Sequence, residues 1–206
     1  MLQQHSLVKA LIAALALTGA ASAVQAQEGP WLVRARAVHL DSDNGDSTGL
    51  NLSVNNKTIP EVDISYFFTP NIAAELILTY PQKHTLYSNG SKIGTLKHLP
   101  PTLSLQYHFA PNATFRPYIG AGINYTHFSS VRFEPAVVAA LDPSIKKNSY
   151  GFSLQAGADF AIAKNIVLNL DIKQVKIDTD VSSKGTKVGT FKVDPLLVGV
   201  GIGYRF

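Results

Sequence analysis

Residues 190–206, TFKVDPLLVGVGIGYRF, decide the fold class of this chain. In an extended strand successive side chains point to opposite faces, so every second residue shares a face. Counted back from Phe206, one face carries only apolar or aromatic residues, and the other carries Arg205 and three glycines. A strand with one apolar face and one small or polar face, ending on an aromatic residue, is typical of the wall of a transmembrane β-barrel.

Seven further segments alternate with the same period of two, which gives eight expected strands. The expected strands are 31–37, 61–68, 72–80, 102–109, 119–126, 149–162, 166–173 and 196–206. Tight turns alternate with connections of roughly ten to twenty residues. In bacterial barrels the short turns face the periplasm and the long loops face outside. We therefore predict an all-β fold, an eight-stranded antiparallel transmembrane β-barrel with short periplasmic turns and long extracellular loops.

A soluble eight-stranded barrel of the lipocalin kind is the alternative, because it shows the same alternation with its apolar face inward. The glycines on the polar face favour the membrane barrel. They would cover a soluble barrel poorly, but inside a narrow barrel they leave room for Arg34 and Arg36.

The amino terminus indicates export. Lys9 precedes an apolar run, and small residues follow up to Ala26, which is the pattern of a secretory signal peptide. We expect residues 1–26 to be the signal peptide, with a second cleavage site after Ala23, and residues 27–206 to form a single outer membrane β-barrel domain. The mature chain then has 17 basic and 14 acidic residues, and a net charge of 17 − 14 = +3 does not indicate nucleic acid as a partner. No later apolar stretch reaches the ~18 residues of a membrane-spanning helix.

Charged residues point inward near the short-turn end of the expected barrel. The predicted charged floor of the lumen consists of Arg34, Arg36, Glu61, Asp63, Glu75, Asp159, Asp171, Lys173 and Arg205. An isolated charge in such an interior costs several kcal/mol, so these groups are expected to pair. Eight strands leave little further room inside, which favours a closed plug over a wide water channel.

Above this floor the inward positions become apolar. The predicted ligand-binding residues of the upper lumen are Val38, Leu40, Ile77, Val175, Ile177, Val193 and Leu197. The seventh expected strand, 166–173, shows this change when it is continued to Val175 and Ile177, and the alternative is a β-bulge near Gln174 that exchanges its two faces.

Prolines interrupt two neighbouring strands at one height. Pro81 lies nine residues above Ile72, and Pro100 lies nine above Phe109, with Pro101 beside it. Each proline removes a donor from the hydrogen-bond ladder. These residues predict a lateral opening in the wall, or they only end the strands.

Several blocks in order resemble the OmpW family of outer membrane proteins, which includes alkane-import porins. The blocks are PEVDISYFFTPNIAAEL from Pro60, KHLPPTLSLQYHF from Lys97, PYIGAGINYTHF from Pro117, LNLDIKQVKIDTDV from Leu168 and KVDPLLVGVGIGYRF from Lys192. The resemblance implies an outer membrane barrel with a hydrophobic lumen, inward movement of small hydrophobic molecules and lateral release into the membrane. No gate residue is carried over.

The resulting hypothesis is a passive channel without enzymatic activity, cofactor or metal, for uptake of small hydrophobic molecules. The expected partners are outer membrane lipids, the solute, and the barrel assembly machinery through the C-terminal strand, while the oligomeric state is left open. One rival is a lipid A-modifying enzyme, for which His127, Ser129 and Glu134 would supply base, nucleophile and carboxylate. The other is a structural or adhesive barrel, whose wall would look the same.

The sequence contains two weak indications of a metal-binding site. The acidic loop 41–46 departs from the spacing of an EF-hand, so a solvated loop is the better interpretation. His84, His98 and His108 are expected at different heights and therefore predict no metal cluster.

Overall fold

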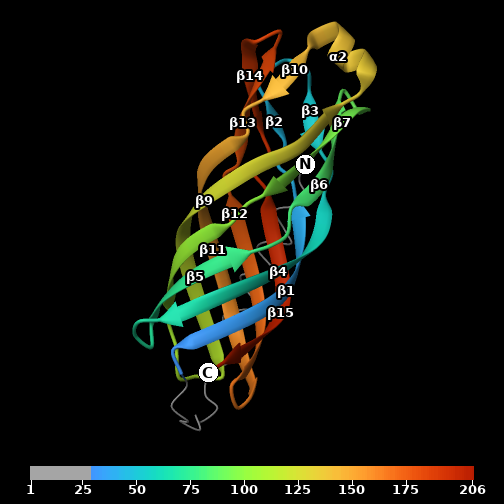
Figure 1. The fold of residues 1–206 in the computed structure, drawn as a ribbon. Helices are drawn as coiled ribbons and strands as arrows, with labels where there is room; N and C mark the ends of the chain where they lie inside the picture. Colours follow the sequence, from blue (N-terminus) through green and yellow to red (C-terminus); the bar gives the residue numbers. More distant parts are fainter. Residues whose placement is uncertain (1–28) are drawn as a thin grey trace, which may run out of the picture.

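The computed structural model describes residues 29–206, and most of them form a closed barrel of antiparallel strands (Figure 1). The barrel strands are β1 (Trp31–Asp41), β4 (Lys57–Phe67), β5 (Ile72–Leu78), β8 (Thr102–His108), β9 (Phe115–Phe133), β11 (Asn148–Ala163), β12 (Ile166–Val175) and β15 (Leu196–Arg205). They run around the barrel in the order β11-β12-β15-β1-β4-β5-β8-β9, and β9 pairs back with β11 to close it. The predicted eight-stranded antiparallel barrel is confirmed. The predicted signal peptide, residues 1–26, lies outside the described residues.

The register of β1 against β15 places each of the two arginines of β1 opposite a glycine. Arg34 pairs with Gly203, and Arg36 pairs with Gly201. A Cβ atom at Gly201 would lie 2.6 Å from Cγ of Arg36, and one at Gly203 would lie 2.9 Å from Cγ of Arg34. Since a slip of one residue would turn every side chain to the other face, the register is fixed by this packing as well as by the apolar pattern.

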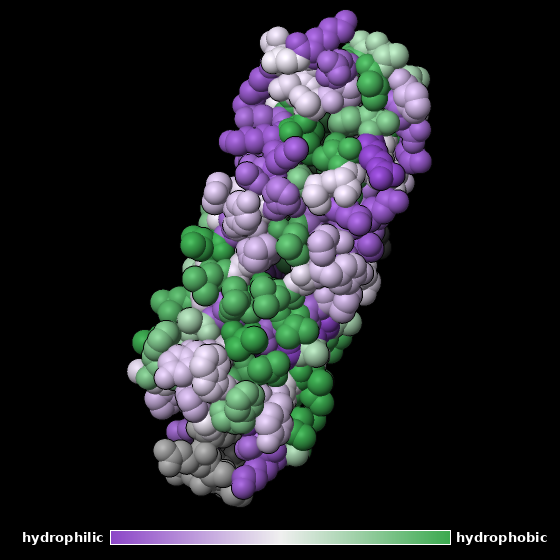
Figure 2. Space-filling model, viewed as in Figure 1, coloured by the Kyte–Doolittle hydropathy of each residue, from purple (hydrophilic) through white to green (hydrophobic). Residues whose placement is uncertain are grey.

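The outward face of the barrel carries an exposed apolar belt. Its large side chains include Val62, Leu76, Leu105, Ile123, Leu154, Leu170 and Val200, each at least 40 % exposed. Figure 2 shows apolar residues gathered over the barrel and hydrophilic ones over its upper extension. Aromatic pairs such as Tyr107 and Phe109, with ring centroids 5.2 Å apart, lie at the short-turn end of the belt. This arrangement fits a barrel wall in contact with lipid. Within residues 29–206 no helix is long and apolar enough to cross a membrane.

Short and long connections alternate as expected, but the long ones are largely β-structured. Beyond the belt lie β2 (Gly45–Asp46), β3 (Leu52–Val54), β6 (Gln82–Ser88), β7 (Ser91–Leu99), β10 (Pro143–Ile145), β13 (Asp178–Ser183), β14 (Thr186–Lys192) and the helix α2 (Pro135–Leu141). β9 is long enough to pair with β8 low in the barrel and with β7 above it. Four of the short strands form a second sheet in the order β10-β13-β14-β2. The predicted loops therefore form an ordered extension above the apolar belt.

This extension has its own hydrophobic core. Buried members are Leu52, Val54, Leu86, Leu96, Phe128, Val175, Ile177, Val181, Phe191 and Val193. This core lies over the upper end of the barrel lumen, so apolar side chains cover that end of the barrel.

Candidate functional site

Two arginines of β1 organise the bottom of the lumen. Arg34 is fully buried, and its guanidinium reaches Asp159 of β11 at 2.7 Å and Asp63 of β4 at 2.9 Å. The Nε and Nη2 atoms of Arg34 both donate to Asp159, which is the bidentate geometry that binds carboxylates most strongly. These contacts tie three strands together across the barrel axis.

The second arginine links the remaining acids. Arg36 Nη2 lies 2.8 Å from Asp63, 3.0 Å from Glu61 and 3.1 Å from Glu75. Lys173 of β12 completes the network, at 3.6 Å from Glu61. Since every partner is buried, the pairs replace the hydration that each charge lost.

All nine residues predicted for the charged floor are buried, and the structure brings them to the same part of the lumen. Arg205 lies at its lower end, where its guanidinium stacks 3.9 Å above the ring of Phe67 and Nε donates to the carbonyl of Gly29. Side chains thus fill the cross-section of the barrel at this height.

Two further members of this layer, Tyr118 and His108, are absent from the predicted floor, although the parity of the fourth expected strand places His108 inside. The Tyr118 hydroxyl donates to Asp171 at 2.8 Å, and Arg34 lies 5.5 Å above the Tyr118 ring. The His108 ring packs 5.0 Å from that of Tyr118. Tyr118 lies below residue 119, where the strand was expected to begin, so its inward parity was not considered.

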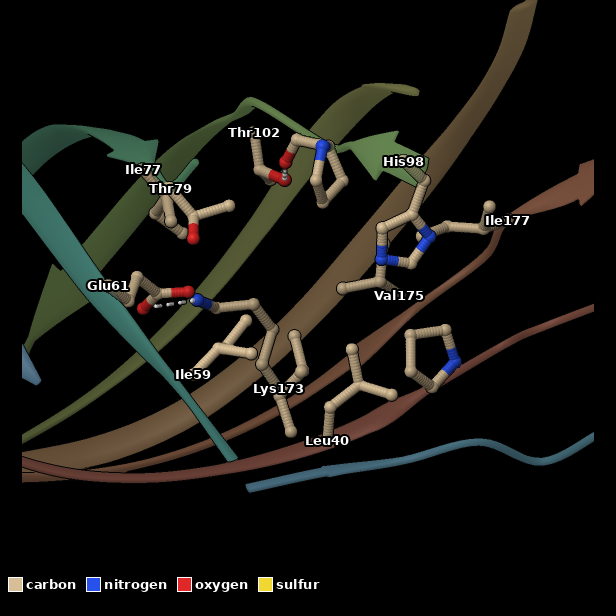
Figure 3. A pocket seen from close by; sticks show the side chains of 13 residues that line it. Leu40, Ile59, Glu61, Ile77, Thr79, His98, Thr102, Lys173, Val175 and Ile177 are labelled. Atoms are coloured by element: carbon tan, nitrogen blue, oxygen red, sulfur yellow. Dashed lines mark hydrogen bonds and ion pairs between the residues drawn. The ribbon is translucent and has the colours of Figure 1, made fainter. Parts of the chain in front are cut away.

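A small apolar cavity lies between the charged floor and the core of the extension (Figure 3). Its lining comprises Leu40, Ile59, Glu61, Ile77, Thr79, His98, Pro100, Thr102, Lys173, Val175, Ile177, Pro195 and Leu197. Its volume, counted as the space open to the centre of a water-sized sphere, is about 20 Å³, which holds about one water molecule. The cavity is therefore closed to any larger solute until its walls move.

Five of the seven residues predicted for the upper lumen line this cavity: Leu40, Ile77, Val175, Ile177 and Leu197. Val38 is buried below it, and Val193 belongs to the core of the extension. Val175 and Ile177 are both buried while Gln174 and Lys176 are partly exposed, so the alternation continues and the bulge alternative near Gln174 is wrong.

The barrel wall beside the cavity has a break in its hydrogen-bond ladder. Pairing of β5 with β8 ends at Ile77 and Thr102 and resumes between β6 and β7 at Gln82 and His98. Pairing of β4 with β5 ends at Val62, and β4 makes no ladder with β6. We call the space between residues 57–61 and residues 82–85 the wall gap.

Side chains bridge the wall gap in place of a ladder. The Thr79 hydroxyl donates to the carbonyl of Pro60 at 2.9 Å, and Lys57 Nζ donates to the carbonyl of Lys83 at 3.3 Å. In an antiparallel strand the N–H and C=O of one residue point to the same side. Because the Pro60 carbonyl points into the gap, the donor that proline lacks is missing there too. From the sequence alone, Pro60 indicates only a bulge or an edge position of a strand.

The opening predicted at Pro81, Pro100 and Pro101 stays a prediction, and the structure shows where these prolines lie relative to the break. Pro100 lines the cavity, whereas Pro81 is exposed beside the wall gap. The carbonyl of Pro101 accepts a hydrogen bond from the Tyr125 N–H, so the wall between β8 and β9 stays joined. The break therefore lies on the β4 side of these prolines.

The expectation that His84 and His98 lie at different heights is wrong. Residues 84 and 98 lie diagonally across the β6–β7 hairpin, and their buried rings approach to 4.6 Å between centroids. His98 lies above the apolar belt, where burial, with help from His84 and Lys57, lowers its pKa to about 3. Within the described residues no three His, Cys, Asp or Glu side chains are grouped to hold a metal ion.

The residues of the rival enzyme do not meet. His127 Nδ1 lies 2.8 Å from Asn148 Oδ1, and Glu134 forms an exposed ion pair with Lys92. In the acidic loop 41–46, the Asp46 carboxylate is engaged by neighbouring donors of the chain. It accepts hydrogen bonds from the N–H and hydroxyl of Thr48 and from the N–H of Leu52.

Comparison with known proteins supplies the deciding observation, since the model of the OmpW family matches residues 23–206. This chain belongs to the OmpW family. It is 41 % identical to the uncharacterized outer-membrane protein y4mB of Sinorhizobium fredii, covering 91 % of this chain and 84 % of that protein. It is 32 % identical to outer membrane protein W of Vibrio cholerae, over 95 % and 97 % of the two chains.

The chain is also similar to two other outer membrane proteins. The outer membrane protein AlkL of Ectopseudomonas oleovorans is 26 % identical over 81 % of this chain and 74 % of its own length. The crystal structure of OprG from Pseudomonas aeruginosa superposes with a TM-score of 0.76 at 25 % identity, covering 87 % of this chain and 97 % of that one. OmpW-family proteins are non-enzymatic barrels, so this chain is a barrel of the outer membrane, embedded in its lipids, and not an enzyme.

Proposed function

We propose that this barrel mediates passive uptake of small hydrophobic molecules across the outer membrane. One observation carries the proposal: an apolar cavity ends on an ion-paired floor, while the wall at the same height lacks its ladder. A solute that reaches the cavity finds its downward path filled by Arg34, Arg36 and their partners. The wall gap is the remaining exit, and its lower end, beside Val62 and Leu78 of the apolar belt, borders lipid.

The energetics support lateral release. Each CH₂ group removed from water contributes about 0.8 kcal/mol, and lipid tails supply the same gain as the cavity. A solute passing sideways therefore stays in apolar surroundings throughout, whereas crossing the floor would require separating buried ion pairs at several kcal/mol each. No energy source beyond the solute gradient is needed.

The family relation supports the same function. The OmpW likeness seen in the sequence implies movement of small hydrophobic molecules, and AlkL is among the relatives. The solute, the lateral route and recognition of β15 by the barrel assembly machinery are inferences of this proposal.

Tethering the wall gap tests the route. Natural cysteines are absent from the sequence, so Lys57→Cys with Lys83→Cys places one pair across the gap, which a short bis-maleimide can join. The matched control, Leu99→Cys with His127→Cys, joins partners of β7 and β9 that already share a ladder. We expect cross-linking of the first pair to slow uptake of a labelled alkane by cells, and cross-linking of the control to leave it unchanged.

Two results would count against the proposal. Equal alkane uptake by cells with and without the gene removes the transport function and favours a structural role, which predicts envelope weakness instead. Normal uptake with the gap tethered keeps transport but excludes the lateral route.

A further inference from the structure

Most side chains that line the cavity are apolar. Two of its polar side chains, His98 and Lys173, each have a nitrogen atom that makes no hydrogen bond of ordinary length within residues 29–206. His98 is 1 % exposed, lines the cavity, and its Nε2 has no hydrogen-bond partner among residues 29–206. Lys173 Nζ lies 3.6 Å from Glu61 and 3.7 Å from Asp171, both beyond ordinary hydrogen-bond length. Figure 3 shows the Lys173 ammonium and the His98 ring on opposite sides of the same space.

The other polar side chains of the lining are already engaged, and Glu61 is held by its ion pair with Arg36 at 3.0 Å. The Thr79 hydroxyl donates to the carbonyl of Pro60, and the Thr102 hydroxyl donates to the carbonyl of Pro100. Eleven buried side-chain atoms of residues 29–206 lack a hydrogen-bond partner, and His98 Nε2 is the one among them that belongs to a neutral side chain lining the cavity. Buried polar atoms in native proteins are nearly always paired, so a water molecule or the polar group of a solute is the partner that this atom requires. A purely apolar solute would leave His98 Nε2 without that partner.

The charge around the cavity selects against an anion. The ion-paired network that includes Lys173 contains three cations, Arg34, Arg36 and Lys173, and five carboxyls, so its formal charge is 3 − 5 = −2 when all are ionised. A carboxylate beside Lys173 would add to this excess. At His98 a carboxylate would meet a neutral ring among apolar side chains and would stay buried without a counter-ion.

We infer that the solute is an uncharged amphiphile, a short apolar chain with one oxygen-bearing head group such as an ester, ketone or alcohol, whose head hydrogen-bonds to His98 Nε2. This inference rests on the proposed uptake function and names its substrate class. The chain of the solute lies against Leu40, Ile77 and Val175, and Lys173 offers a second donor to a head group that enters in the opposite orientation.

Imidazole nitrogen resonances test the inference without a transport assay. The full-length mature protein, labelled with ¹⁵N-histidine, is placed in lipid nanodiscs and titrated with octane, methyl octanoate and octanoate, each expressed as its mole fraction in the lipid. Methyl octanoate is expected to shift the His98 Nε2 resonance and to half-saturate at a mole fraction about three- to tenfold lower than octane, the range set by one net hydrogen bond. Octanoate is expected to bind more weakly than the ester.

Variants separate the head-group contact from packing. His98→Phe keeps a ring of similar bulk, and binding is then followed on the methyl signals of Val175 and Ile177, where the preference for ester over octane should vanish. His84→Phe is the matched control, because His84 is equally buried and packs against His98 but does not line the cavity. The ester preference should survive that change.

The outcomes distinguish the two proposals. If octane and ester both bind with equal strength, or octanoate binds best, the head-group inference is overturned while uptake of hydrophobic molecules stands. If no ligand perturbs the lining residues at all, both the inference and the proposed function fail.

Discussion

Removing the charge of Arg34 should destabilise the barrel far more than removing an exposed charge. Arg34 is fully buried and makes a bidentate contact with Asp159 and a 2.9 Å contact with Asp63. In Arg34→Met, Asp159 loses its closest cation and Asp63 keeps only its contact with Arg36, while both acids remain in the lumen. Breaking a buried pair by removing one partner costs about 3–5 kcal/mol, so we expect a loss of that size in the free energy of unfolding.

Urea unfolding of the protein reconstituted in lipid vesicles measures this cost, with the mobility difference between heated and unheated samples on gels as a second check. Lys92→Met is the control, since Lys92 and Glu134 form an ion pair in which both side chains are about half exposed. An exposed pair contributes about 0–1 kcal/mol. The double variant Arg34→Met with Asp159→Asn should recover part of the loss, because fewer uncompensated charges stay buried.

The reasoning is refuted if Arg34→Met and Lys92→Met cost the same. That result would mean that water reaches the lumen freely and solvates Asp63 and Asp159, so the floor would not be a closed, ion-paired layer.

Three further predictions concern the lumen, the extension and the wall gap. Gly201→Ala should lower the free energy of unfolding by about 1–3 kcal/mol, because the new Cβ would clash with the carbonyl oxygen of Ala35. Gly45→Ala, with ordinary contacts at 3.5 Å, is its control in the same urea assay. A free histidine has a pKa of about 6.5, whereas burial lowers the pKa of His98 to about 3. Between these values the unfolded chain binds a proton at residue 98 that the folded chain does not bind, so the free energy of unfolding falls as pH drops from about 6.5 toward 3. Hydrogen exchange should show faster exchange of the amides of the extension over that range. His98→Phe should flatten this pH dependence, and an unchanged profile would contradict it. Pro60→Val restores an N–H on the gap side of β4 and should slow alkane uptake several-fold, whereas unchanged uptake would show that the missing donor is unimportant.

Much of this fold follows from side-chain parity alone. The period-two pattern identified all eight barrel strands, and it placed Glu61, Asp63 and Lys173 inside because each alternates with residues that suit lipid. The same rule explains why Val175 and Ile177 were placed correctly: no bulge intervenes, so parity continues from Lys173 upward.

The alternation of side chains along each strand does not predict which segments pair with one another. The approach of His84 to His98 depends on the register of the β6–β7 hairpin, which no sequence pattern here specified. The wall gap depends on which strand fails to pair with β4, and Pro60 became meaningful only once its carbonyl was seen to point into that gap. The extension was missed as structure because its short strands are stabilised by contacts between distant connections.

Anomalous scattering from a brominated solute tests the central claim most directly. Crystals of the protein grown with 1-bromooctane should show bromine density inside the cavity bounded by Leu40, Val175 and Ile177, or in the wall gap beside Pro60. Density below Arg34 and Arg36, on the periplasmic side of the floor, would show that the solute passes through the ion-paired layer. Such density, or bromine found only on the outer lipid-facing wall, would contradict the account.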